Sequence, residues 1–473
     1  MVKAVVADEA QLKALEESLS SSSPQAQVGL VVGKLSASSD RALIYALLPT
    51  PPTDAHAPAC SLRASSSAAA KPKTSSKAAS AAAPSLEFDV DWIAEHARQV
   101  SRMLLGGMGV IGVYIWASEA SFKATSPALL SQVIRAVSHS WCGSDVAERL
   151  LIHISYSPRR WACRICEIAS GSLRPCDFKY SKLLASLQTF RCKYNFEIRL
   201  TVVQAEPFKR VILKAINHLA EEVQNAKALI DGHLISEDIN ISTEGPHRVD
   251  FLVPFKNSMP VEEWSLEGVA GLLRFSGSVS ALAYLGPKES ISEAISYLKV
   301  DIITSLRSRL DIILDEVDDD STTNDLEKSP SQNAAQIIFR ELRGPYSFLF
   351  PRRVLIPWLA DTYVCDYLQQ SETTQDATER CREVISLETI VDSSSVLEPE
   401  GAAGSATLES FWDMVPGASS SSLAGSSLKD KSGQKDDSRG TQGGSFNIIA
   451  ALFALLVALI VGSVLTFSAS WKT

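Results

Sequence analysis

Residues 89–117, DVDWIAEHARQVSRMLLGGMGVIGVYIWA, carry the most informative pattern in this chain of 473 residues. In the first half of the stretch, four side chains fall at helical spacing: Trp92, His96, Val100 and Met103. Asp89 or Asp91 can cap the start of that helix, and a glycine pair ends it. The apolar run 109–117 then has the composition of a buried strand.

The flanking sequence continues this alternation of strands and helices. On the N-terminal side, the apolar, β-branched runs 28–35 and 41–50 predict a pair of strands. On the C-terminal side, Ser126 and Pro127 begin a helix over 126–137, and two apolar runs flank Pro158 as a hairpin. A strand at 196–203 and a helix from Pro207 to Ile230 complete the first region, 1–230.

The second region, 231–391, begins with strand candidates at 248–255 and 278–285. A long helix follows, marked by one apolar stripe: Ile291, Ile295, Leu298, Ile302, Leu306, Leu310 and Ile313. The apolar segments RRVLIPWL and TYVCDYL close the folded part. Strands and helices mix in both regions, so we predict an α+β fold in two domains or one extended body.

Three polar segments are too poor in large apolar side chains to offset the entropy of an ordered chain. They are an Ala/Ser/Pro/Lys-rich insertion at 51–86, a polar loop at 318–333 and a Ser/Gly/Ala-rich stalk at 392–445. We expect the insertion and the stalk to be disordered, and residues 318–333 to form a loop.

Charge and cysteine content narrow the functional classes. The net charge of −9 argues against a nucleic-acid-binding surface, which would normally be basic, so we expect no nucleic-acid partner. Eight cysteines at irregular spacings suit buried thiols in a reducing compartment better than a disulfide framework.

The C-terminal run from Phe446 to Phe467, FNIIAALFALLVALIVGSVLTF, contains no charged residue. As a helix rising about 1.5 Å per residue it would span about 33 Å, enough to cross the lipid bilayer. The N-terminal sequence does not resemble a signal peptide. Because only SASWKT follows the run, the helix would leave the ribosome after synthesis ends, so we expect post-translational insertion. Basic residues before the run place the preceding body in the cytosol: Lys429, Lys431, Lys435 and Arg439.

Motifs for catalysis are weak. Residues 107–112 fit the motif G-x-G-x-x-G. In a dinucleotide site this motif follows a strand and begins a helix, whereas here it follows a helix and enters a strand. A turn with a close backbone crossing is therefore favoured. Cys163 and Cys166 form a lone C-x-x-C within a predicted strand, where their side chains would point to opposite faces. We therefore predict no cofactor and no metal site.

One enzymatic alternative stays open. A cysteine hydrolase could pair Cys142, Cys163 or Cys166 with His139 or His153, because such pairing depends on three-dimensional geometry. A low thiol pKa in a cleft would favour this alternative, whereas inert thiols would favour a binding protein.

The block 91–117, together with PRRVLIP and VCDYL at 351–368 and the C-terminal apolar run, resembles the odorant-response-abnormal-four family. This resemblance implies a tail-anchored protein of the endoplasmic reticulum that assists maturation and trafficking of multi-spanning membrane proteins. It also implies a partnership with the protease specific for the ubiquitin-fold modifier. The insertion at 51–86 departs from the animal pattern and suggests a plant homologue.

The same block resembles an MPN domain, the fold of the JAMM metalloisopeptidases. In active members, the strand corresponding to 109–117 ends in a His-x-His pair that binds zinc. Here the corresponding positions hold other residues, Tyr114, Ile115, Trp116 and Ala117, and the chain contains no His-x-His. Without two imidazoles a catalytic zinc cannot be held, so the resemblance implies a pseudoenzyme with no catalytic residues.

Within the stalk, the segment LESFWDMVP is an isolated apolar island. Phe411, Trp412 and Val415 resemble the aromatic-x-x-aliphatic motif that ubiquitin-like autophagy modifiers bind by strand addition. A short helix packed on the body, or an anchor for the protease partner, would also explain it.

Overall fold

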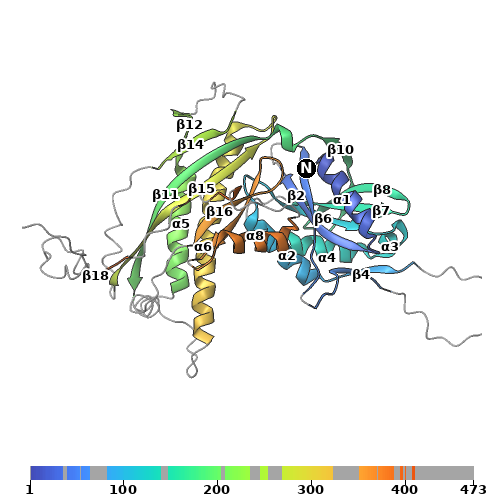
Figure 1. Ribbon diagram of the computed structural model, residues 1–473, viewed down its shortest axis with the longest axis horizontal. Coiled ribbons are helices and arrows are strands. Elements are labelled where there is room, and N and C mark those ends of the chain that lie inside the picture. The colour runs from blue at the N-terminus through green and yellow to red at the C-terminus, as the bar shows by residue number, and fades with distance from the viewer. Residues whose placement is uncertain are drawn as a thin grey trace, which may run out of the picture. The chain divides into compact units, whose positions relative to one another are not determined.

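The computed structural model describes residues 2–35, 40–53, 55–63, 83–139, 147–203, 208–234, 245–253, 269–322, 351–369, 371–387, 395–397, 400 and 407–410. All of them belong to one compact unit, Met1–Val415. The fold is mixed α+β, as predicted, and contains two large sheets (Figure 1).

The first sheet has eight strands in the order β10-β1-β3-β2-β6-β7-β8-β9. Their bounds are β1 (Ala4–Asp8), β2 (Gln27–Leu35), β3 (Arg41–Pro49), β6 (Gly109–Trp116), β7 (Glu148–Tyr156), β8 (Arg159–Glu167), β9 (Leu173–Pro175) and β10 (Asp177–Ser181). β2 and β3 pair in antiparallel register, and β7 and β8 form a hairpin, so the predicted strand pair and hairpin are confirmed. β6, the predicted buried strand, lies inside the sheet with every residue buried.

Each face of the first sheet carries its own apolar cluster. Leu30 and Val32 of β2 belong to one cluster and Val31 to the other, because successive side chains of a strand point to opposite faces. The first face packs against α2 (Val90–Met103), α3 (Glu119–Ala124) and α4 (Pro127–Ser138). The second face packs against α1 (Glu9–Ser22).

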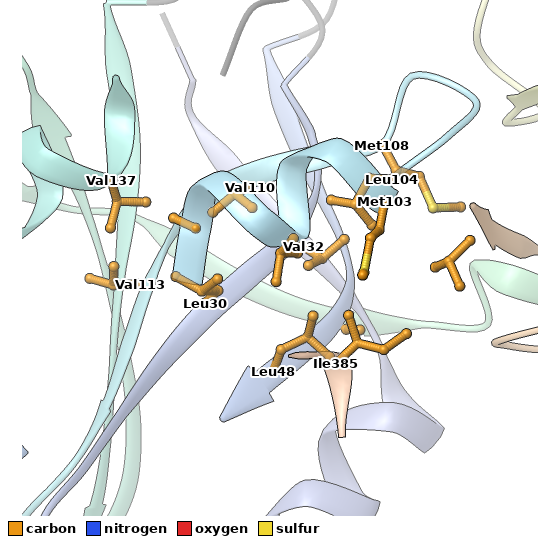
Figure 2. Close-up of a cluster of buried hydrophobic side chains, with 14 of the residues drawn as sticks. Leu30, Val32, Leu48, Met103, Leu104, Met108, Val110, Val113, Val137 and Ile385 are labelled. Carbon is orange, nitrogen blue, oxygen red and sulfur yellow. The ribbon is translucent and has the colours of Figure 1, made fainter. Parts of the chain in front are cut away.

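Helix α2 forms as the sequence predicted. Asp89 is its N-cap and accepts a hydrogen bond from the Trp92 amide at 3.0 Å. Figure 2 shows Met103, at the end of α2, with Leu104 and Met108 beside apolar side chains of β2 and β3. The helix therefore anchors the glycine turn that leads into β6.

The second sheet has six strands in the order β13-β12-β14-β11-β15-β18. Their bounds are β11 (Gln188–Val203), β12 (Lys227–Ile230), β13 (His233–Leu234), β14 (His247–Leu252), β15 (Val269–Leu285) and β18 (Thr407–Ser410). Its core is shared with α5 (Phe208–Asn225) and α6 (Ile291–Thr322). The predicted stripe on α6 is confirmed, since five of its members are buried and the first two are partly buried: Leu298, Ile302, Leu306, Leu310 and Ile313, then Ile291 and Ile295.

The division expected at residue 230 falls inside this second sheet, between the paired strands β12 and β13. β11 and β12 belong to the second sheet although the sequence assigned both to the first region. Residues 227–230, expected to end a helix, instead form β12 because their backbone pairs with β14. The two sheets therefore divide between Ser181 and Gln188.

The hairpin of β16 (Arg352–Pro357) and β17 (Tyr363–Leu368), together with α8 (Thr374–Ile385), was expected in the second domain. Its buried apolar side chains instead belong to the cluster on the α2 face of the first sheet. His96 of α2 contributes to this packing, because its imidazole nitrogens contact Thr50 Oγ1 at 3.2 Å and the Val384 carbonyl at 2.8 Å. The first core thus combines residues separated by almost three hundred positions.

All three polar segments contain ordered residues. At the ends of the 51–86 insertion, β4 (Cys60–Arg63) and β5 (Ser85–Phe88) pair in antiparallel register, with Cys60 and Leu86 buried. Residues 64–82 lie outside the described part. The boundary predicted for the loop at 318–333 is too early, because helix α6 continues to Thr322.

Candidate functional site

The end of β6 is the position at which the MPN resemblance would require metal ligands. Tyr114, Ile115, Trp116 and Ala117 are all buried there, and Trp116 donates its indole N–H to the Pro24 carbonyl at 3.0 Å. Burial raises the pKa of Tyr114, so its hydroxyl stays neutral. Over the described residues, no group of three or more His, Cys, Asp or Glu side chains could hold a metal ion.

The glycine run 107–112 packs against protein rather than forming a phosphate cradle. Gly106 and Gly107 have φ values of +68° and +82°, so both adopt the left-handed turn conformation. A Cβ on Gly106 would lie 2.1 Å from the Tyr284 ring, and one on Gly107 would lie 2.6 Å from the Tyr297 ring. Tyr284 belongs to β15, whose backbone also pairs with the turn. The predicted turn with a close backbone crossing is confirmed.

The C-x-x-C pair also behaves as expected for a strand. Cys163 and Cys166 are both buried in β8, and they belong to the clusters on opposite faces of the first sheet. Burial raises the pKa of Cys166. The pKa of Cys163 is raised by a hydrogen bond that its thiol donates to Cys176 and by burial. These thiols are therefore protonated and poorly nucleophilic at neutral pH.

His153 of β7 is not positioned to activate either thiol. Its ring stacks on Phe122 with centroids 3.9 Å apart, and its Nε2 lies 3.2 Å from the Ala117 carbonyl. Cys166 lies on the same face of the sheet as His153. However, His153 is paired with Ala162, which is four positions before Cys166 on β8, so the two residues are about 13 Å apart along the hairpin. Burial lowers the pKa of His153 to about 4, so the imidazole is neutral at physiological pH.

His139 is exposed at the end of α4, where its Nδ1 lies 2.7 Å from the Arg135 carbonyl. Within the described ranges, no hydrogen bond joins a thiol to a histidine. Cys142 lies outside those ranges. The described part of the chain therefore does not assemble the cysteine hydrolase that the sequence left open.

A buried cation joins the first sheet to the second region. Lys34 of β2 has a side chain only 1 % exposed, and its ammonium donates to the Tyr284 carbonyl and to Glu289, 3.0 Å away. It also lies 4.2 Å from the centroid of the Tyr297 ring. Burial lowers the pKa of Lys34, while the adjacent Glu289 carboxylate opposes this shift. The cluster holds the glycine turn, β15 and the start of α6 together.

The C-terminal strap, defined as residues 395–397, 400 and 407–410, is the least expected feature of the body. Leu397 exchanges two backbone hydrogen bonds with Leu355 of β16, both 2.9 Å long. β18 pairs in antiparallel register with residues 271–274 of β15. The prediction of a disordered stalk beginning at 392 is therefore wrong, because its first part supplies a strand and a bridge to the folded body.

Glu400 fixes the middle of the strap. Its carboxylate lies 2.7 Å from Nη2 of Arg309, and both side chains are almost fully buried. It also accepts the backbone amides of Ser280 at 2.7 Å and Arg353 at 2.8 Å. One carboxylate thus joins β15, α6 and β16.

A second buried pair lies next to it. Arg353 donates to both carboxylate oxygens of Asp301, at 2.9 and 3.0 Å, and Asp301 also accepts the Leu282 amide at 3.1 Å. Such bidentate pairs are rigid. The two ion pairs can position a chain segment, but they hold no free nucleophile or base.

The predicted site residues lie beyond the strap. Phe411, Trp412 and Val415 follow β18 directly but are outside the described residues, as are the anchor residues Phe446 and Phe467. Leu408 and Glu409, the start of the same apolar island, lie in β18. Among the described residues, no helix has the length and apolarity needed to cross a membrane. Sequence reasoning missed Glu400, since a glutamate between Pro399 and a Gly/Ala/Ser tract gives no signal of burial.

The chain matches one family model, described as "Odorant response abnormal 4-like", over residues 29–396. The match begins in β2 and ends in the C-terminal strap. Among curated proteins, the "Protein odr-4 homolog" of Homo sapiens is 24 % identical over 328 residues, covering 63 % of this chain and 69 % of the relative. The homologues of Mus musculus and Dictyostelium discoideum are 22 % and 25 % identical over 67 % and 61 % of this chain, and 72 % and 62 % of their own length.

Among solved structures, the crystal structure of UfSP from C. elegans aligns with 81 % of this chain and 57 % of its own. The TM-score is 0.36 and the sequence identity is 9 %. A TM-score this low does not establish a shared fold.

Proposed function

Because this chain belongs to the Odorant response abnormal 4-like family, we propose that it is a non-enzymatic membrane adaptor that assists maturation and trafficking of multi-spanning membrane proteins. The observation that carries this proposal is the family match, which extends through both sheets to the strap. The burial of the two ion pairs at the strap supports a positioning role over a catalytic one.

In this proposal the run from Phe446 to Phe467 is a single C-terminal anchor in the endoplasmic reticulum membrane, and the body faces the cytosol. The length and apolarity of the run support the anchor. The strap precedes the anchor in the sequence, so it connects the body to the chain that leads to the membrane.

The first sheet with α2 and α4 is an MPN-like domain that has lost its chemistry. The support for this is the end of β6, where four buried residues occupy the positions that a zinc site would need. The domain therefore binds instead of cleaving. Its partner is the protease specific for the ubiquitin-fold modifier, which the adaptor retains at the membrane.

The proposal is tested by purifying the chain and its associated proteins from cell membranes. We compare the full chain, a variant lacking 446–473 and a variant in which 446–467 is replaced by an unrelated apolar helix of equal length. The full chain and the replacement should fractionate with membranes together with the protease and multi-spanning clients. The deletion should release a soluble body that still binds the protease.

Three results would contradict the proposal. Membrane retention after the deletion would rule out the anchor. Glycosylation at Asn240, which lies in the acceptor sequence Asn240-Ile241-Ser242, would do the same, because a cytosolic body cannot receive it. Isopeptidase activity of the purified chain that is lost with a chelator would rule out a non-enzymatic role.

A further inference from the structure

Two cysteines lie opposite each other in the first sheet: Cys163 in β8, and Cys176, the residue between β9 and β10. β8 and β9 are antiparallel, with Arg164 opposite Pro175, so one step further along the same ladder Cys163 is opposite Cys176. The Cys176 amide donates to the Cys163 carbonyl at 3.2 Å, which extends the ladder to this pair. Residues opposed in this way have Cα atoms about 5.5 Å apart, within the range of disulfide-bonded cysteines.

Both side chains point to the same face of the sheet. Cys163 is buried in the cluster beneath α1, and Cys176 packs against that cluster while remaining half-exposed. A hydrogen bond between the thiols lowers the pKa of Cys176 and raises that of Cys163, and Arg174 lowers the pKa of Cys176 further. The pair therefore has one accessible, more acidic thiol and one buried partner.

The remaining described cysteines differ from Cys176. Burial raises the pKa of Cys60, Cys192 and Cys365 to about 12 each, and it also raises the pKa of Cys166 and Cys381. All five are buried. Thiols of this kind react slowly with electrophiles and oxidants.

We propose that Cys176 and Cys163 form a redox modification site that reacts with hydroperoxides and closes to a reversible disulfide between β8 and the residue that joins β9 to β10. The reaction does not depend on the trafficking role proposed above. Cellular thiols would reduce this disulfide and restore both cysteine thiols, as is usual for disulfides of reducing compartments.

The chemistry takes two steps. The Cys176 thiolate attacks one oxygen of hydrogen peroxide and the O–O bond breaks, which leaves a sulfenic acid and, with the proton that the thiol lost, one water. The Cys163 sulfur then attacks the sulfenic sulfur, so that the S–S bond forms and the S–O bond breaks. The Cys163 proton leaves with the hydroxide as a second water, and the two thiols have together lost two electrons to the peroxide.

The test treats the reduced full chain with hydrogen peroxide, blocks the remaining thiols with iodoacetamide and maps non-reduced peptides by mass spectrometry. We expect a peptide that joins Cys163 to Cys176, the loss of two of the eight thiols, and complete recovery of both with dithiothreitol. The matched control is Cys166→Ser, which removes the other cysteine of the C-x-x-C and should leave the linkage intact.

The variants separate the roles of the two thiols. Cys176→Ser should abolish the linkage and leave Cys163 reduced, whereas Cys163→Ser should leave Cys176 as a sulfenic acid that dimedone traps. Without peroxide, iodoacetamide should modify Cys176 of the native wild-type chain before the other described cysteines, which requires no variant to fold. A free Cys176 after peroxide treatment, or a disulfide that uses Cys142 or Cys166, would overturn the proposal.

Discussion

At the scale of single residues, the stability of the folded body depends on glycines and on a histidine that are closely packed against neighbouring side chains. Gly106 and Gly107 allow the end of α2 to turn against two tyrosine rings. Burial keeps the His153 imidazole of β7 neutral, while its ring stacks on Phe122 of α3 and its Nε2 contacts the Ala117 carbonyl. Each site has a direct consequence for stability.

Replacing Gly107 with alanine should destabilise the protein by several kcal/mol. The new Cβ would meet the Tyr297 ring at 2.6 Å, and the positive φ would add about 1 kcal/mol of strain. Gly232→Ala is the matched control, since φ there is +84° with nothing within 4 Å of the new Cβ. Chemical denaturation should show a much larger loss for Gly107→Ala, and equal losses would contradict the packing role of the turn.

His153 should make the fold sensitive to acid. Its pKa is about 4 when folded and near 6.5 when unfolded, so below pH 6.5 the unfolded chain binds the extra proton. Stability should therefore fall between pH 6.5 and pH 4, by up to about 3 kcal/mol, with no contribution above pH 6.5. His153→Phe keeps a ring to stack on Phe122, and denaturation across this pH range should show a shallower loss than in wild type. Identical pH profiles would refute the assignment.

At the scale of elements, the C-terminal strap links secondary structures that do not otherwise share a ladder. Leu397 extends the β16–β17 hairpin, β18 extends β15, and Glu400 between them joins α6 to both. Neither a bridge of one residue nor a strand of four residues is stable alone, so the strap depends on its buried carboxylate.

Glu400→Ala should cost about 3–5 kcal/mol, because it leaves the Arg309 guanidinium buried without its carboxylate. Hydrogen exchange should speed up at 407–410 and at Leu397 more than in β6. As a control, Asp40→Asn removes an ion pair with Lys3 that is exposed on both sides, and should change neither stability nor exchange. Unchanged protection of β18 in Glu400→Ala would show that the strap is held by other contacts.

At the scale of the whole molecule, the strap determines where the body ends. The apolar island that begins at Leu408 is divided, since its first residues pair with β15 and Phe411, Trp412 and Val415 follow beyond the described strand. A partner that binds these three residues would engage the chain immediately next to the second sheet.

A peptide of residues 405–418 should bind a ubiquitin-like autophagy modifier, with Trp412 and Val415 filling its two pockets. Trp412→Ala combined with Val415→Ala should abolish binding in isothermal titration calorimetry. Leu408→Ala in the same peptide is the control and should bind like wild type, since Leu408 lies outside the four-residue motif. Equal binding by the double variant, or none by wild type at high micromolar concentration, would rule the motif out.

The sequence by itself predicted those helices and strands whose residues follow a regular local pattern. The cap at Asp89, the helical spacing of α2, the apolar run of β6 and the stripe on α6 each depend on a few neighbouring residues, so they can be recognised without knowledge of the fold. The absence of a His-x-His pair is likewise visible in the sequence.

Only the tertiary structure decided which elements belong together. β11 and β12 join the second sheet, and β16, β17 and α8 complete the first core, because backbone pairing and burial act between residues far apart in the chain. The burial of Glu400 likewise could not be predicted from the sequence. Its sequence surroundings predict a solvated linker, yet an arginine ninety-one positions earlier and two backbone amides offset the cost of burying its charge.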